Sequence, residues 1–290
     1  MSRAPRFLVC DAYTADGREI LQAGGASIAG HRYAALLTRL APPGATADVF
    51  FVADPGAELP APLASYDGVV WTGSSLTAYH DVPEVRCQIE LARRVLDVGV
   101  PAFGSCWAAQ IAAIAGGGRV DANPLGREAG VARKIRLSPE GASHPLYRGK
   151  AGVFDAFTMH NDVVVAVDPS TTRVLASNPY ADVQAVAVEV RRGRFWAVQY
   201  HPEWDLGELA RIFVCRTPQL LAGGFFPDEA ALLAYVDDLE ALAADPGSKA
   251  LRWRLGVDDD VLDEALRARE VVNWMSALVL PRAGGSAAAR

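Results

Sequence analysis

The sequence predicts an α/β fold: a doubly wound, mainly parallel sheet with an antiparallel section and a C-terminal helical extension. Short apolar runs alternate with helical patterns through the first part of the chain, which is typical of parallel sheets flanked by helices. Strand-like runs then follow one another up to residue 200, and the pattern beyond residue 203 is helical. We therefore expect two units, residues 1–205 and 206–290.

The alternating part is read from apolar runs and from apolar spacing. Tyr33, Leu36, Leu37 and Leu40 recur at helical spacing, and the glycine-containing segment before them predicts a flexible stretch that includes Gly30. The expected strands are residues 6–11, 48–53, 66–71 and 100–104, and the expected helices are residues 31–40 and 83–98.

The second part predicts antiparallel strands followed by helices. Residues 191–193 form a hairpin signal between the last two strand-like runs. Pro227 begins one expected helix, and a further helix is expected to begin at residue 258 and to end at Pro281. Residues 284–290 form a short low-complexity tail. The expected strands of this part are residues 132–137, 153–157, 173–177, 183–190 and 194–200.

Composition excludes several classes of protein. The chain has 290 residues, 51% of them hydrophobic, and a formal net charge of -6, so no basic surplus exists to neutralise nucleic-acid phosphates. No apolar run approaches the roughly 18 residues of a membrane span. No secretory signal is recognisable at the N-terminus, and the four cysteines have no paired spacing. These features predict a soluble protein of the cytoplasm.

A cysteine stands where an apolar run changes into an alanine-rich helix. Gly104 and Ala108 flank Cys106 two residues to either side, which resembles the nucleophile elbow G-x-S-x-G with a thiol in place of the hydroxyl. Such a turn would hold the sulfur at the carboxyl end of a strand and at a helix N-terminus, whose partial positive charge favours thiolate. The alternative interpretation is a buried free cysteine without chemistry.

A catalytic thiol needs a base and a group that orients the base. Among the five histidines, His201 directly follows a strand-like run and is followed two residues later by Glu203. In an extended chain, side chains at these positions point the same way, so Glu203 can reach the imidazole. For an isolated pair of this kind, a structural histidine beside an unrelated surface glutamate would be the favoured interpretation; here the elbow supplies an independent need for a base and its orienting acid.

Together these segments resemble a known family. The segment from Gly104 to Gln110 is similar to the G-x-C-x-G-x-[QH] motif of class I (triad) glutamine amidotransferases, and residues 198–203 are similar to their Q-[FY]-H-P-E motif. Residues 71–75 stand where the family has its oxyanion segment, and residues 159–162 match its H-[GS]-D segment. The resemblance spans about residues 5–205 and implies a flavodoxin-like fold, as in a stand-alone GMP-synthase-type glutaminase domain.

The resemblance implies cleavage of the glutamine side-chain amide through a γ-glutamyl thioester, without a cofactor or metal. One departure is Ala108, which replaces the second glycine of the family motif; a left-handed conformation there would cost roughly 1 kcal/mol or more. The implied roles are catalysis by Cys106, His201 and Glu203, oxyanion stabilisation by backbone N–H groups of Gly73 and Trp107, and substrate binding by Gln110 and His160.

Several functions stay open at this point. A cysteine α/β-hydrolase is disfavoured because its acid normally precedes its histidine in the chain. A dinucleotide or phosphate site is disfavoured because the glycines at 116–118 follow a helix and not a strand, which is typical of a helix C-terminal cap. A γ-glutamyl hydrolase that acts alone and a non-enzymatic binding or regulatory member remain alternatives. Ammonia delivery would need a separate synthetase partner, because the chain has no nucleotide-binding motif; the C-terminal helices could dock that partner.

Overall fold

One nine-stranded sheet organises the molecule in the computed structural model, which describes residues 3–285. The first two residues of the expected unit 1–205, and the last five of the expected unit 206–290 and of the tail at 284–290, lie outside the described residues. The strands are β1 (Arg6–Asp11), β2 (Thr46–Phe51), β3 (Gly68–Trp71), β4 (Ala102–Ser105), β5 (Arg119–Ala122), β6 (Glu128–Leu137), β7 (Val153–His160), β8 (Asp162–Ala166), β9 (Thr172–Ser177), β10 (Ala185–Val190) and β11 (Gly193–Val198).

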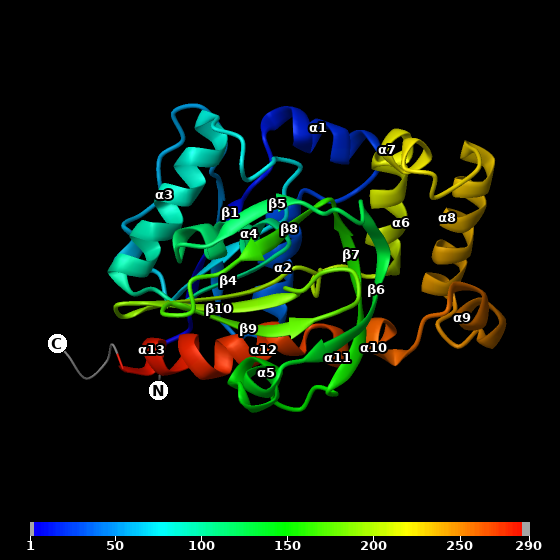
Figure 1. Cartoon of the computed structure of the whole chain (residues 1–290). Helices are drawn as coiled ribbons and strands as arrows, with labels where there is room; N and C mark the ends of the chain where they lie inside the picture. The colour runs from blue at the N-terminus through cyan, green and yellow to red at the C-terminus, as the bar shows by residue number, and fades with distance from the viewer. Residues whose placement is uncertain (1–2, 286–290) are drawn as a thin grey trace.

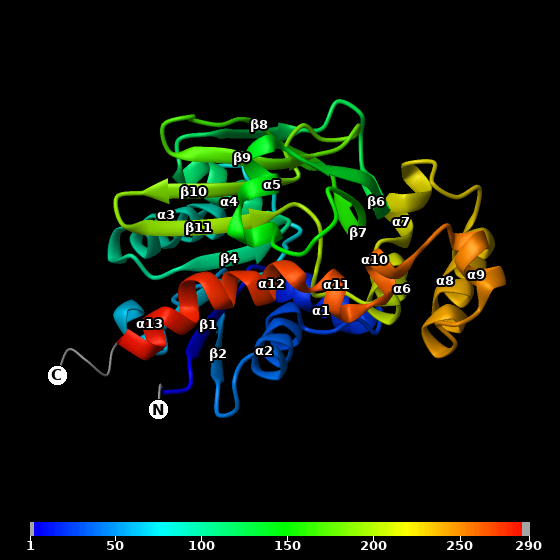
Figure 2. The same cartoon turned by 90° about the horizontal axis from the view of Figure 1, so that it is seen from below.

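The sheet has a parallel half and an antiparallel half (Figure 1). Its strands lie in the order β2-β1-β3-β4-β11-β10-β9-β6-β7, most of which can be followed in Figure 2. Strands β1 to β4 and β11 pair in parallel, and β11, β10, β9, β6 and β7 pair antiparallel. Strands β5 and β8 form a separate antiparallel pair, which the sequence did not predict. The parallel and antiparallel halves of the large sheet confirm the predicted mixed α/β fold.

Helices cover both faces of the sheet. They are α1 (Ala15–Ala23), α2 (Ala29–Leu40), α3 (Pro83–Val98), α4 (Trp107–Ala115), α5 (Pro139–Ser143), α6 (Leu206–Cys215), α7 (Thr217–Ala222), α8 (Glu229–Ala244), α9 (Lys249–Leu255), α10 (Asp259–Leu262), α11 (Glu264–Arg267), α12 (Arg269–Trp274) and α13 (Leu280–Gly285), with short 3-10 turns at Leu63–Ser65 and Pro145–Tyr147 and a π-helical turn at Met275–Val279.

Alternation along β1 divides the core into two layers. Leu8 and Cys10 pack with α3 and α4, whereas Phe7 and Val9 pack with α2 and with the C-terminal helix α12. Figure 2 shows α12 and α13 running along this second face. A third cluster joins α1 to α6, α8 and the inner face of β7. The C-terminal helices thus complete the layers of the sheet.

Two expectations about helices were wrong. Gly30, expected in a flexible stretch, lies inside α2, where its N–H donates to Oδ2 of Asp11 at 2.8 Å. The single helix expected from residue 258 is broken at Asp263, whose carboxylate caps a new helix instead of continuing the old one. Pro281 lies inside a helical segment that runs without a break from α12 through the π-helical turn at Met275–Val279 into α13, so it does not end the helix. The π-helical turn directly before it already departs from regular α-helical hydrogen bonding.

The helices of the described chain are short relative to a bilayer. Within residues 3–285, none combines the length and the apolar character needed to cross a membrane.

Candidate active site

The predicted elbow is present between β4 and α4. Cys106 has φ 54° and ψ −99°, a conformation that non-glycine residues rarely adopt and that is often found at functional sites. Its N–H donates to the carbonyl of Val198 at 2.7 Å, which ties the turn to the end of β11. Gly104 makes the turn sterically possible, because a Cβ there would lie 2.3 Å from the carbonyl oxygen of Trp71.

Ala108 fits the elbow without strain. The strained residue is Cys106, whereas Ala108 lies in the first turn of α4 and has no positive φ. Its buried methyl group occupies the space that the missing side chain of Gly104 leaves open, since a Cβ on Gly104 would approach it to 2.5 Å. The exchange of glycine for alanine is therefore accommodated by right-handed helical backbone.

His201 and Glu203 form a buried pair. Nδ1 of His201 lies 2.7 Å from Oε1 of Glu203, and Nε2 of His201 is buried without a partner in the described chain. The sequence argument for this pair assumed an extended chain, but β11 ends at Val198 and residues 202–203 form a turn. This turn, in which the N–H of Trp204 approaches the carbonyl of His201 at 3.4 Å, returns the carboxylate to the imidazole.

Neighbouring side chains hold the pair in place. Oε1 of Glu203 also accepts a hydrogen bond from the hydroxyl of Ser105 at 2.9 Å, and the hydroxyl of Tyr33 lies beside both groups. The indole of Trp204 stacks on the His201 ring, with centroids 3.5 Å apart and planes 5° apart. These contacts restrict both the plane and the tautomer of the imidazole.

The surroundings of the Cys106 thiol disfavour its ionisation. Burial raises its pKa to about 12, and the negative charge of Glu203 acts in the same direction. The N–H of Trp107 at the start of α4 lowers the pKa, as the sequence argument expected, but burial outweighs this effect. The helix terminus therefore does not produce a standing thiolate, and ionisation needs a base.

Gly73 and Trp107 lie beside the thiol. A Cβ placed on Gly73 would lie 2.9 Å from Cε1 of His201, which is too close, and 3.6 Å from Cβ of Cys106. The glycine thus lets the loop after β3 approach both side chains. The N–H of Trp107 lies within hydrogen-bonding reach of the sulfur. Both residues line the same cavity as Cys106.

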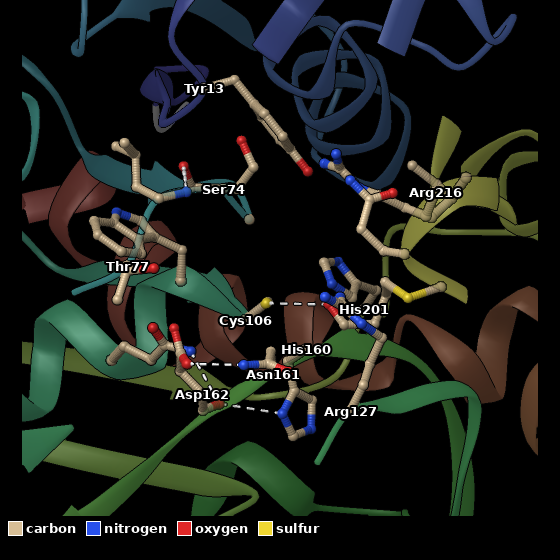
Figure 3. Close-up of a pocket in the computed structure, with 18 of the residues that line it drawn as sticks. Tyr13, Ser74, Thr77, Cys106, Arg127, His160, Asn161, Asp162, His201 and Arg216 are labelled. Carbon is tan, nitrogen blue, oxygen red and sulfur yellow. Dashed lines mark hydrogen bonds between the residues drawn. The ribbon is translucent and has the colours of Figure 1, made fainter. Parts of the chain in front are cut away.

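A cavity of 260 Å³ connects the predicted residues (Figure 3). Its wall includes Gly73, Cys106, Trp107, Gln110, His160 and His201, whereas Glu203 lies behind His201. Such a volume lies below the range of about 300–1,000 Å³ that is typical of sites for drug-sized ligands. The cavity therefore suits a ligand of about amino-acid size.

Gln110 and His160 have different surroundings in this cavity. Nε2 of Gln110 donates to the carbonyl of Asp162 at 3.2 Å, while its Oε1 is buried without a partner in the described chain. Both ring nitrogens of His160 already have partners, the carbonyl of Asp162 at 3.2 Å and the carboxylate of Glu128 at 2.8 Å. Gln110 thus offers a free acceptor, whereas His160 supports the wall.

Sequence reasoning missed other side chains of the cavity. Tyr13 lies in the loop after β1, Arg127 immediately before β6, and Arg216 between α6 and α7. None belongs to a recognisable motif, and only the folded chain brings them to Cys106. Asp162 also lines the cavity, and its carboxylate accepts from the hydroxyl of Tyr79 at 3.3 Å.

The acidic, thiol and imidazole side chains of the described region do not form a metal site. Within residues 3–285, no three histidine, cysteine, aspartate or glutamate side chains are grouped so that they could hold a metal ion.

Comparison with known proteins defines the family. Residues 33–214 match the family model described as glutamine amidotransferase class-I, so the chain belongs to this family. A glutamine amidotransferase from Thermotoga maritima has the same fold, with a TM-score of 0.64 and 16% identity over 95% of this chain and 100% of that chain. A glutamine amidotransferase from Methylobacillus flagellatus gives a TM-score of 0.54 and 18% identity over 96% of this chain and 93% of that chain.

Two kinds of curated relative extend this comparison. A γ-glutamyl-L-1-hydroxyisopropylamide hydrolase from a Pseudomonas species is 33% identical over 248 residues, which are 81% of this chain and 80% of that protein. The GMP synthase of Pseudomonas syringae is 34% identical over 141 residues, which are 47% of this chain and 25% of that protein. The chain thus matches only about a quarter of the length of that synthase.

Proposed function

We propose that this class-I glutamine amidotransferase cleaves the side-chain amide of a γ-glutamyl group with a Cys106–His201–Glu203 triad. The observation that carries this proposal is the convergence of a strained, buried thiol and a carboxylate-bound imidazole on one cavity. Each group supplies what the others need, because the thiol requires a base and the base requires an orienting acceptor.

The first half of the reaction forms a thioester. Nε2 of His201 takes the proton of the Cys106 thiol as the sulfur attacks the γ-carbonyl carbon. The N–H groups of Gly73 and Trp107 stabilise the resulting oxyanion, a contribution of roughly 3–4 kcal/mol for each donor. The carbon–nitrogen bond then breaks, the leaving nitrogen takes the proton from His201, and ammonia or an amine departs.

The second half releases the acyl group. Water attacks the thioester carbon while His201 accepts a proton from it, and the carbon–sulfur bond breaks. The sulfur recovers its proton, and a free γ-carboxylate leaves. Throughout, Glu203 accepts from Nδ1 of His201 and stabilises the imidazolium.

Gln110 is our candidate for binding the amino group of the substrate. Its unpartnered Oε1 is a hydrogen-bond acceptor in a buried wall, and the carboxylate of Asp162 adds negative charge to the same wall. An α-ammonium group would satisfy this acceptor, whose burial without a partner is otherwise unfavourable. We propose a supporting role for His160, because its ring nitrogens are occupied.

A hydrolase that acts alone is the more strongly supported version of this function. The γ-glutamyl amide hydrolase relative matches four-fifths of this chain, including helices beyond residue 205, whereas the GMP synthase relatives match less than half of it. The small cavity agrees with the γ-amide of a small amine. Ammonia delivery to a separate synthetase subunit, docked on residues 206–290, is the second candidate, supported by the GMP synthase relatives.

Turnover of two substrates tests the proposal. Purified protein is given L-glutamine or a γ-glutamyl N-(hydroxyalkyl)amide, and release of glutamate and of ammonia or amine is measured. We expect turnover of both, higher kcat/KM for the alkylamide, and no turnover by Cys106→Ala. Preference for glutamine, with stimulation by an added synthetase subunit, would favour ammonia delivery. If neither substrate is turned over, the amidase function is refuted.

A further inference from the structure

Two arginines share the cavity of Cys106. Arg127 reaches it from the turn before β6, and Arg216 from the junction of α6 and α7. In Figure 3, Tyr13 and Arg216 approach each other on one side of Cys106, while Asp162 lies on the other side. Both arginines are half-buried, so their charges are only partly screened by water. Arg216 and Asp162 thus lie on opposite sides of the thiol, and Arg127 lies within electrostatic range of both.

In the described part of the chain, residues 3–285, no carboxylate forms an ion pair with Arg127 or Arg216. Glu128, the nearest acid in sequence to Arg127, is held by His160 and by the amides of Asn178 and Gln184 at 2.7 and 2.9 Å. Its carboxylate therefore is not available to the neighbouring guanidinium.

The charge of Arg216 acts on Arg127. Burial lowers the pKa of Arg127 and the positive charge of Arg216 lowers it further, whereas the negative charge of Asp162 acts in the opposite direction. The hydroxyl of Tyr13 lies within hydrogen-bonding reach of Arg216 and can align it without supplying a charge. Two like charges in a half-buried wall are unfavourable until an anion is bound, so this wall is prepared for an anionic ligand group.

We propose that Arg127 and Arg216 form a carboxylate subsite, which binds the free α-carboxylate of a γ-glutamyl substrate. This inference rests on the proposed amidase function and defines its substrate class. A guanidinium binds a carboxylate through paired hydrogen bonds. In a γ-glutamyl substrate, the α-carbon and two methylene groups separate the α-carboxylate from the γ-carbonyl that Cys106 attacks. Asp162 and Gln110, which line the same cavity, match the α-ammonium group. The negative charge of Asp162 disfavours a multiply charged phosphate in this cavity.

Family membership alone does not account for this subsite. Tyr13 and Arg216 lie outside residues 33–214, the part of the chain that matches the family model. Arg216 belongs to the C-terminal helical region, which also contributes Ile212 and Gln219 to the cavity wall. The extension therefore takes part in substrate selection and not only in packing.

Binding to a non-acylating protein tests the subsite. Calorimetry on full-length Cys106→Ser measures affinity for L-glutamine and for 4-aminobutanamide, which lacks the α-carboxylate. Adding Arg127→Gln or Arg216→Gln should weaken glutamine binding at least about tenfold and change 4-aminobutanamide binding less than about twofold. Arg136→Gln, an exposed arginine of β6 outside the cavity, is the matched control and should change neither.

Three results would overturn the subsite: unchanged glutamine affinity, equal weakening of both ligands, or no binding of glutamine by the parent protein. Where 4-aminobutanamide binds too weakly to titrate, the ratio of kcat/KM for the two amides, measured with Cys106 intact, replaces its affinity. Wild-type turnover measured in parallel separates the two proposals. If the wild type turns over and the arginine variants keep the wild-type preference for glutamine over 4-aminobutanamide, only the subsite is refuted. If the wild type does not turn over, the amidase function is refuted.

Discussion

At the residue scale, the thiol of Cys106 is held in a geometry that the protein must stabilise. Its positive φ costs on the order of 1–3 kcal/mol, and its burial opposes ionisation. Packing of Gly104 against Trp71 and the hydrogen bond from the Cys106 N–H to Val198 hold the turn in this conformation. We interpret this strain as pre-organisation of the nucleophile.

The raised pKa of Cys106 predicts how the free enzyme reacts with alkylating agents. Because the pKa lies near 12, the thiolate fraction should rise about tenfold for each pH unit between pH 7 and 9, without a plateau. Iodoacetamide labelling, resolved by peptide mass spectrometry to exclude the exposed Cys87, measures this rate. A plateau below pH 8 would show that the resting thiol is already ionised.

The carboxylate of Glu203 should matter through its charge and not through its bulk. Glu203→Gln keeps the size of the side chain but cannot stabilise an imidazolium, so we expect kcat to fall by about a hundredfold or more. Ser105→Ala removes a single neutral donor to this carboxylate and should lower kcat by less than about tenfold. Steady-state kinetics and thermal melting compare the two; equal, small losses would argue against the triad.

At the element scale, the elbow depends on how β4 enters α4. The turn requires Gly104 for steric reasons, since any side chain there meets the backbone of Trp71 and the methyl group of Ala108. Ala108 itself needs no left-handed conformation. The two small residues are therefore not equivalent, although the motif places them symmetrically about Cys106.

This asymmetry can be measured with single substitutions. Gly104→Ala should abolish turnover and lower the melting temperature markedly, because its Cβ would lie 2.3 Å from a backbone oxygen. Gly152→Ala is the matched control, because a Cβ there meets nothing within 4 Å. A Gly104→Ala protein that melts and turns over as the wild type does would contradict the described elbow.

The sequence predicted the central elements well, for a physical reason. Buried strands such as β1 are nearly continuous apolar runs, and α3 carries a clear apolar stripe. Helix α1 was missed because only Gly17 and Leu21 of it are buried, which leaves no stripe to detect. The turn after His201 was missed because local alternation does not reveal where a strand ends.

The residues of the candidate site also differ in whether the sequence alone could predict them. Cys106, His201 and Glu203 lie in short local motifs, so the sequence could pair them without knowledge of the fold. Arg127 and Arg216 have no such motif, and long-range packing brings them to Cys106, with Gly130 of β6 lying against Phe213 of α6. Residues of that kind cannot be identified before the chain is folded.

At the scale of the whole molecule, the C-terminal helices and the sheet share one core. Trp274 of α12 packs on Phe7 and Phe103, with ring centroids 6.1 and 5.7 Å apart. Glu270 of α12 accepts from the hydroxyl of Tyr200, which directly precedes His201, at 2.6 Å. A boundary at residue 205 stays a prediction, but these contacts lead us to expect that residues 206–290 support the site.

Two tryptophans of the extension test this expectation. Trp274 is fully buried, so Trp274→Ala should reduce the free energy of unfolding by about 3–5 kcal/mol in a single transition. Trp253 is 89% exposed, and Trp253→Ala should change it by less than about 0.5 kcal/mol. Denaturant unfolding followed by circular dichroism gives both values. A separate low-stability transition in Trp274→Ala would indicate an independent appendage.

Trapping of the acyl-enzyme tests the catalytic triad most directly. The wild-type protein is mixed with a γ-glutamyl alkylamide, quenched in acid and measured as an intact protein, and the modified peptide is then sequenced by mass spectrometry. We expect one γ-glutamyl group on Cys106, removable by hydroxylamine, and none on Cys106→Ala. Turnover by Cys106→Ala at the wild-type rate, or a γ-glutamyl group on another residue, would contradict the proposed mechanism.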